Sequence, residues 1–151
     1  MARAPFQILV FPFRRVPGAV EYAVFKRSDT GWWQGISGGG EGDETPLDAA
    51  RREAWEEAGI PEGVPFIPLD SKATIPAEEF GWPWGKDVLV VPEHAYGVEV
   101  FDRKLQLSSE HTEVKWMDLE TARQAVRFDS NRNALWELHH RLARSGRERS
   151  A

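Results

Sequence analysis

The stretch GGGEGDETPLDAARREAWEEAGI, residues 38–60, decides the fold of this chain. It follows Trp32 and Trp33 in a glycine-rich segment, residues 31–42, that we expect to be a loop. Thr45 is a residue type that favours helix N-caps, and Pro46 suits the first helical position. Apolar residues then recur at steps of three and four, at Leu47, Ala50, Ala54 and Ala58. Because Gly59 suits the position after a helix end, the stretch predicts one amphipathic helix over Pro46–Ala58.

The predicted helix carries three carboxylates, Glu53, Glu56 and Glu57, on a second face. At about 100° per residue, these side chains share one arc of about 100°. Like charges at such spacing destabilise an isolated helix, and a bound cation reverses that effect. Hard divalent ions such as magnesium prefer carboxylate oxygens, so the face predicts a metal site. Arg52 can pair with Glu56 and fix its orientation. The alternative is a solvated acidic face, since glutamate is a good helix former.

The spacing of this stretch fills the fixed positions of the Nudix box, a loop–helix–loop motif whose helix carboxylates hold metal. The filled positions are Gly38, Glu44, Arg52, Glu53, Ala54, Glu56, Glu57, Gly59 and Ile60. Over most of its length the chain also resembles the Nudix branch that contains dihydroneopterin triphosphate pyrophosphatases, often labelled dATP pyrophosphohydrolases. That likeness rests on the common order of Pro5, Phe25-Lys26-Arg27, Trp33-Gln34, Ser37-Gly38, Glu110-His111, Lys115-Trp116 and Ser130-Asn131-Arg132.

The resemblance implies an α/β fold, the Nudix-type α/β/α sandwich with a mixed sheet. We expect one such domain over residues 1–151, with residues 144–151 as a frayed tail. The resemblance also implies dependence on Mg²⁺, with Mn²⁺ as a substitute, and release of pyrophosphate from a nucleoside or pterin triphosphate. Other Nudix substrates, such as a dinucleoside polyphosphate or ADP-ribose, remain alternatives. A Nudix fold that only binds ligands is a further alternative, which the complete box disfavours.

The roles of individual residues follow from the helix face and from the resemblance. Glu53 and Glu57 are the first expected metal ligands and Glu56 is a further one, with Arg52 as an orienting residue. The resemblance adds the Gly38 carbonyl and Glu110 to the metal site. Glu44 is expected to be structural. The general base stays open between Glu110 and the box glutamates, and Glu113 is a rival for the role of Glu110.

Substrate contacts are predicted from the strand end before the box and from the segment after it. Lys26 is favoured as a phosphate contact, and the resemblance suggests that Ser37 bonds the substrate. Trp82 and Trp84, like Trp32, could stack a base, with packing in the core or a lid as the alternative. Tryptophans 116 and 136 are expected in the core.

The rest of the chain predicts an alternation of strands and helices. Strands are expected at residues 7–13, 21–27, 95–101 and 114–117, and helices at 120–126 and from 129 to about 143. Residues 61–94 are rich in proline, so we expect an irregular segment with a short strand near Phe66.

Composition limits the partners of the protein. The 151 residues contain no cysteine, which excludes disulfides and thiolate metal sites. The net charge of −5, with both signs mixed along the chain, argues against nucleic acid or a membrane surface as a main partner. No targeting segment is visible. We therefore expect a cytoplasmic monomer or homodimer that binds a small nucleotide or pterin triphosphate.

Overall fold

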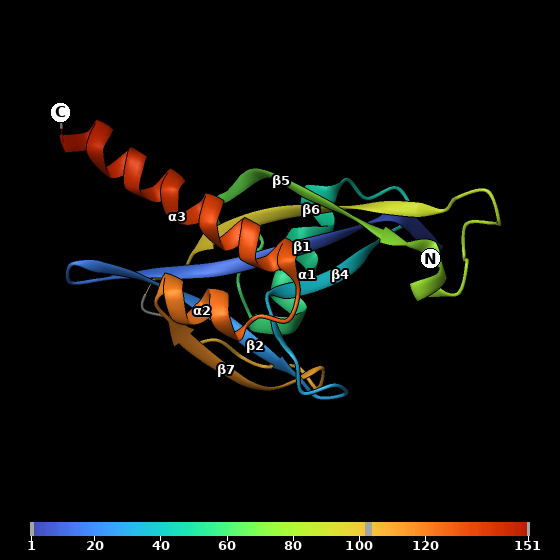
Figure 1. Cartoon of the computed structure of the whole chain (residues 1–151), viewed down its shortest axis with the longest axis horizontal. Coiled ribbons are helices and arrows are strands. Elements are labelled where there is room, and N and C mark those ends of the chain that lie inside the picture. Colours follow the sequence, from blue (N-terminus) through green and yellow to red (C-terminus); the bar gives the residue numbers. More distant parts are fainter. Residues whose placement is uncertain (1, 102–103, 151) are drawn as a thin grey trace.

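The computed structural model describes residues 2–101 and 104–150. Its strands form one mixed, seven-stranded sheet with helices on both faces (Figure 1). The strands are β1 (Arg3–Val16), β2 (Ala19–Arg27), β3 (Trp33–Gln34), β4 (Ile36–Glu41), β5 (Phe66–Pro76), β6 (Val90–Glu99) and β7 (His111–Met117). The helices are α1 (Pro46–Ala58), the short 3₁₀ helix η1 (Ala77–Phe80), α2 (Leu119–Ala125) and α3 (Asp129–Ser150). The described residues hold no helix with the length and apolar character needed to cross a membrane.

Strand β1 is the centre of the sheet. It pairs antiparallel with β2 and β4 and parallel with β6. Successive side chains of a strand point to opposite faces. Ile8 and Val10 accordingly join the core beneath α1, and Leu9 and Phe11 join the core beneath α2 and α3. The predicted α/β/α sandwich with a mixed sheet is confirmed, because each face of the sheet is covered by helix.

The glycine-rich segment is mostly strand, so the predicted loop over residues 31–42 is wrong in part. β3 pairs with β2, whereas β4 pairs with β1, and Gly35 stands between the two strands. A side chain at Gly35 would collide, because its Cβ would lie 2.9 Å from both Leu9 Cδ1 and the Val10 carbonyl oxygen. Pairing with the central strand supplies backbone hydrogen bonds that the weak strand propensity of glycine does not signal.

The segment from 61 to 94 is also more regular than the sequence predicts. β5 pairs antiparallel with β6, which begins at Val90 and ends at Glu99 rather than covering residues 95–101. β5 lies at the edge of the sheet, where a proline with no N–H to donate is tolerated. Pro68 and Pro76 therefore lie in an edge strand and not in an irregular loop.

The last helix differs from its prediction in length and in the place of one tryptophan. α3 continues to Ser150 instead of ending near Ala143, and its additional residues include arginine and glutamate, which are good helix formers. Trp136 is 48% exposed and stacks on His140 with ring centroids 4.2 Å apart, so its prediction as core is wrong. The buried stripe of this helix is Ala134, Leu135, Leu138 and Leu142, on the opposite side. Trp116, by contrast, packs against the core beneath α1.

Candidate active site

Helix α1 is fixed at both ends as the sequence predicts. The Thr45 hydroxyl accepts from the Asp48 N–H at 3.2 Å, and the Asp48 carboxylate accepts from the Thr45 N–H at 3.2 Å. Gly59 ends the helix with a φ of 71°, a conformation that glycine adopts without strain. The buried face consists largely of alanines, at positions 49, 50, 54 and 58. These small side chains let the helix lie close to the sheet.

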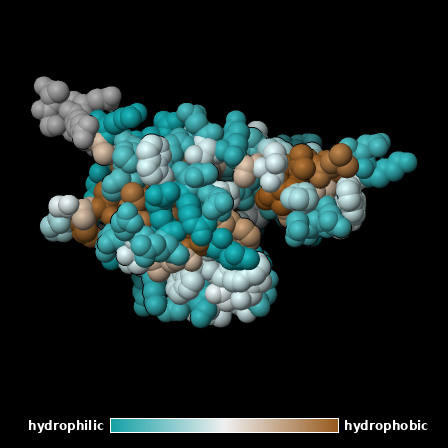
Figure 2. Space-filling view, viewed as in Figure 1, coloured by the Kyte–Doolittle hydropathy of each residue, from teal (hydrophilic) through white to brown (hydrophobic). Residues whose placement is uncertain are grey.

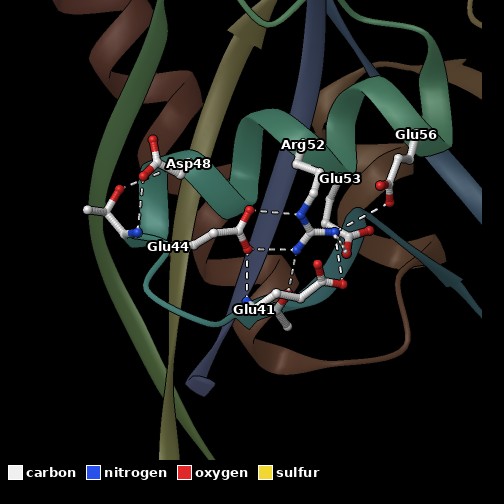
Figure 3. Close-up of polar contacts among 8 residues, drawn as sticks. Glu41, Glu44, Asp48, Arg52, Glu53 and Glu56 are labelled. Atoms are coloured by element: carbon white, nitrogen blue, oxygen red, sulfur yellow. Dashed lines mark hydrogen bonds and ion pairs between the residues drawn. The ribbon is translucent and has the colours of Figure 1, made fainter. Parts of the chain in front are cut away.

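Arg52 joins α1 to the glycine strand β4 (Figure 3). Its guanidinium donates to both oxygens of Glu44, at 2.9 and 3.0 Å, and to the Gly39 carbonyl at 2.9 Å. Glu44 also accepts the Glu41 N–H at 2.8 Å. The hydrogen bonds from Arg52 lower the pKa of Glu44. Glu44 is therefore a structural anchor, in agreement with its expected role.

Of the expected metal ligands, Arg52 orients Glu53 more closely than Glu56. Arg52 Nη1 donates to Glu53 Oε1 at 2.9 Å but lies 3.4 Å from Glu56 Oε2. The predicted pairing of Arg52 with Glu56 is thus present, but it is the longest of the Arg52 hydrogen bonds. The Glu56 side chain is 53% exposed, and exposed ion pairs contribute little because water screens them.

Gly38 lies beside the Glu53 carboxylate. A Cβ at position 38 would collide with Glu53 Cδ and Oε1, so a side chain here would displace this carboxylate. The backbone of β4 and the carboxylate of α1 are consequently in close proximity. The backbone carbonyl of Gly38 and the Glu53 carboxylate are both oxygen donors of the kind that a divalent ion prefers.

Glu57 is the most buried charged group of the site. It is 2% exposed, and neither of its carboxylate oxygens has a hydrogen-bond donor. Burial first, and then the neighbouring carboxylates of Glu110 and Glu53, raise the pKa of Glu57. Those carboxylates lie within hydrogen-bonding range, but they can share a hydrogen bond only if one is protonated. Buried oxygens without a donor therefore fit a bound cation.

The oxygen ligands present suit a divalent ion, but their side chains are not arranged as a complete coordination site. As the side chains lie, the described residues contain no group of three or more His, Asp or Glu side chains that could hold a metal ion. Glu53 and Glu57 supply carboxylate oxygens from α1, and Glu110 reaches the same place from outside the box. Water and substrate phosphate complete the coordination of many such ions in proteins.

Glu110 is held at the site through its backbone. Its carbonyl accepts the Ser28 N–H at 2.9 Å and the Ser28 hydroxyl at 3.1 Å, just beyond the end of β2. His111, which follows it, is buried with its ring 5.2 Å from that of Phe25. The rival Glu113 is the cross-strand partner of Lys26 and lies 3.5 Å from the Lys115 amine. The structure thus brings Glu110, and not Glu113, beside Glu57.

A cation that interacts with Glu57 and Glu110 is Arg27, the neighbour of the predicted phosphate contact Lys26. Lys26 pairs with Trp33, which packs against the core beneath α2 and α3, so Lys26 lies on the face away from α1. Arg27 points to the other face. The hydrogen bond from its guanidinium to Asp29 raises its pKa most, and the charge of Glu57 contributes further. The available signal was the predicted strand over residues 21–27, because successive side chains of a strand point to opposite faces.

The other predicted substrate residues are spread over two places. Ser37 accepts a hydrogen bond from Gln34 Nε2 at 2.9 Å, next to Gly38. The Trp84 indole donates to the Arg3 carbonyl at 2.8 Å, so this ring is tied to β1. Trp82 is 43% exposed with a φ of 59°. Trp82 and Trp84 belong to a segment that projects beyond the sheet.

Comparisons with known proteins agree with this geometry. The model of the NUDIX domain matches residues 13–138. The crystal structure of a candidate NUDIX hydrolase of Listeria monocytogenes has a TM-score of 0.86 and 37% identity, over 94% of this chain and 97% of that chain. Dihydroneopterin triphosphate diphosphatase of Haemophilus influenzae is 27% identical over 114 residues, which are 73% of this chain and 72% of that protein. Octanoyltransferase of Myxococcus xanthus is 32% identical over 80% of this chain, and the match spans 32% of that protein's length.

The chain therefore belongs to the NUDIX domain family. It is an enzyme of the Nudix hydrolase class, which acts on nucleoside diphosphate derivatives.

Replacing Glu57 with Gln tests whether this carboxylate is kept for a cation. Because folding raises the pKa of Glu57, the metal-free protein loses stability as pH rises above the unfolded pKa of glutamate, about 4.3. Glu57→Gln lacks this loss and can donate to neighbouring carboxylates. At pH 8 without metal we expect its melting temperature to rise by about 2–4 °C, and added Mg²⁺ should no longer stabilise it.

The exposed residue Glu62 provides the matched control, since Glu62→Gln should change neither quantity. Thermal unfolding with and without Mg²⁺ measures both. A Glu57→Gln protein that melts lower than the parent without metal, yet gains as much from Mg²⁺, would contradict the assignment.

Proposed function

We propose that the enzyme uses Mg²⁺ to hydrolyse a phosphoanhydride bond of a nucleoside or pterin triphosphate, with pyrophosphate and a monophosphate as products. The observation that carries the proposal is the buried, donor-free carboxylate of Glu57 beside Glu53 and Glu110. The complete box supports hydrolysis rather than binding alone. The name of the Haemophilus influenzae relative supports the triphosphate class.

In this proposal, the carboxylates of Glu53, Glu56, Glu57 and Glu110 and the Gly38 carbonyl would hold the metal, and the Glu56 side chain is 53% exposed. When bound, Mg²⁺, or Mn²⁺ in its place, neutralises phosphate oxygens and acidifies a water molecule. The residues of the chain orient these ligands and bind the substrate. Arg52 keeps the Glu53 carboxylate turned toward Gly38.

Two groups of residues serve proton transfer and substrate binding. The Glu110 carboxylate, on a loop anchored by its own backbone, is our first candidate to accept the proton of the attacking water, with the box glutamates as alternatives. Ser37 hydrogen-bonds the substrate beside the metal. Trp82 and Trp84, on the segment between η1 and β6, are proposed to contribute to binding of the substrate's ring.

A product assay tests the function itself. Purified protein with Mg²⁺ should convert a nucleoside or pterin triphosphate to its monophosphate and release pyrophosphate, and excess EDTA should stop the reaction because the phosphate charge is no longer neutralised. Chromatography of the nucleotide and a pyrophosphate-specific assay give both products. Orthophosphate as the sole phosphorus product, or full activity in EDTA, would refute the proposal. Cleavage of ADP-ribose or dinucleoside polyphosphates alone would move the enzyme to another Nudix class.

The role of Glu110 is tested against its neighbour Glu113. Glu110→Gln should lower kcat by about 10²-fold, the size expected for a group that acts on the transition state, and should leave the melting temperature of the metal-free protein close to that of the parent. Glu113→Gln is the matched control and should retain most activity, because Glu113 faces Lys115 on β7. Equal losses in the two variants would count against Glu110.

The phosphate contact is tested by the adjacent residues Arg27 and Lys26. Arg27→Ala should raise KM for the triphosphate by about 10-fold or more, since a hydrogen bond to a charged group contributes about 1.5–3 kcal/mol. Lys26→Ala should raise KM less, because Lys26 lies on the face away from α1. Arg14→Ala serves as a control, since Arg14 is likewise paired with one carboxylate, that of Glu21. A larger effect at Lys26 would restore the assignment favoured by the sequence.

A further inference from the structure

A hollow of the surface reaches the candidate metal site, and larger hollows lie elsewhere on the described residues. Grooves of about 1010 and 880 Å³ lie along α3 and beside Trp116, away from the carboxylates. A smaller pocket of about 270 Å³ is lined by Glu53 itself, by Gly39 and Gly40 of β4, and by Gln7, Glu41 and Phe80. We propose that this pocket holds the heteroaromatic ring of the substrate and selects rings that carry an exocyclic amino group. This inference rests on the proposed triphosphate hydrolysis.

The aromatic wall of the pocket is Phe80, which belongs to the segment that follows β5. Arg3 Nη1 donates to the Phe80 carbonyl at 3.4 Å, and the Trp84 indole donates to the Arg3 carbonyl at 2.8 Å. Trp84 also packs edge-on against Phe80, with ring centroids 5.7 Å apart and planes at 69°. The base of the segment is closed by the Ala77 N–H, which donates to the Leu89 carbonyl at 2.8 Å.

These tethers hold η1 beside the first residues of β1, where Figure 1 places the N-terminus of the chain. Figure 2 shows apolar atoms gathered on the same projecting end. An aromatic ring fixed in advance is a good stacking surface, because little conformational freedom remains to be lost on binding. Trp84 thus acts as a positioning residue for Phe80.

The floor of the pocket is backbone. A Cβ at Gly40 would stand 2.2 Å from Phe6 Cζ, and one at Gly39 would stand 2.7 Å from Gln7 Nε2. A side chain at Gly40 would displace the Phe6 ring, and one at Gly39 would displace the end of the Gln7 side chain. A floor without side chains lets a flat ring approach the strand closely.

The polar lining favours ligands that donate hydrogen bonds. Glu41 and Glu53 are carboxylates, and Arg3 is the cation of the lining. The nearest cation to Glu41 is Arg52, at 3.7 Å, so its half-exposed carboxylate keeps free lone pairs. An amino group on a ring can donate to such an oxygen, whereas thymine and uracil present carbonyl oxygens at the equivalent positions. A carboxylate oxygen and a base carbonyl oxygen that face each other both lose their hydrogen bonds to water and form none in exchange, so binding of thymine or uracil is disfavoured.

Glu53 connects this pocket to the chemistry. One side chain lines the pocket, contacts the backbone of Gly38 and receives the hydrogen bond from Arg52. A ring seated against Phe80 would therefore leave its phosphates next to the carboxylates of α1.

The test is a comparison of kcat/KM for dATP, dGTP, dCTP and dTTP with Mg²⁺ in the parent and in two variants. The parent should prefer each amino-bearing nucleotide over dTTP by about 10-fold or more. Phe80→Leu should raise KM for all four by about 10-fold at nearly constant kcat, because stacking is lost and the metal site is not. Glu41→Gln should reduce the preference over dTTP while KM for dTTP falls. Phe101→Leu and Glu62→Gln, at exposed positions outside the pocket, are the matched controls.

The outcomes separate this inference from the proposed function. Pyrophosphate release with unchanged KM and unchanged base preference in both variants would overturn the pocket and leave the hydrolase proposal standing. If the protein cleaves none of the four nucleotides, titration calorimetry with dAMP and dTMP still decides the matter. Binding of dAMP that Phe80→Leu weakens by about 10-fold supports the pocket, and equal or absent binding of the two monophosphates overturns it.

Discussion

The arrangement of this site depends on the hydrogen bonds that the Arg52 guanidinium donates. This group donates to the two oxygens of Glu44, to the Gly39 carbonyl and to Glu53, and so it joins α1, the strand β4 before it and the connection between them. Such a planar group with donors in fixed directions can satisfy several acceptors at once, which a lysine could not do. Its neighbours raise the pKa of Arg52 further, chiefly through the hydrogen bonds to Glu44, so its charge is permanent.

The positive charge of Arg52 matters because several carboxylates lie close together at this site. Arg52 compensates Glu44 and Glu53, but Glu57 is buried with no donor and lies beside two other carboxylates. Burial of an unpaired carboxylate opposes folding, and the raised pKa of Glu57 expresses that cost. The proposed hydrolysis of a triphosphate would gain from this arrangement, since the same oxygens would bind the divalent ion that the substrate also needs.

The division of the sheet into two faces determines which residues can meet at the site. Neighbours in sequence, Lys26 and Arg27, point to opposite faces, and so only one of them approaches the box helix. Conversely, residues distant in sequence meet there, because β7 pairs with β2 and brings Glu110 to the end of that strand. The segment after β5 reaches the other side of Glu53 in a similar way, through its hydrogen bonds to the start of β1.

The sequence by itself determined the parts that depend on local order. The cap at Thr45, the helix Pro46–Ala58, its end at Gly59 and the cluster of box glutamates are all set by neighbours a few residues apart, and each was predicted. Only the tertiary structure decided that the glycine segment is strand, that the proline-rich segment is an edge strand, and that Trp136 is exposed. It also decided that Arg27 rather than Lys26 faces the carboxylates and that Phe80 borders Glu53. Strand pairing and the facing of side chains depend on partners far away in the chain, and local propensity carries no information about those partners.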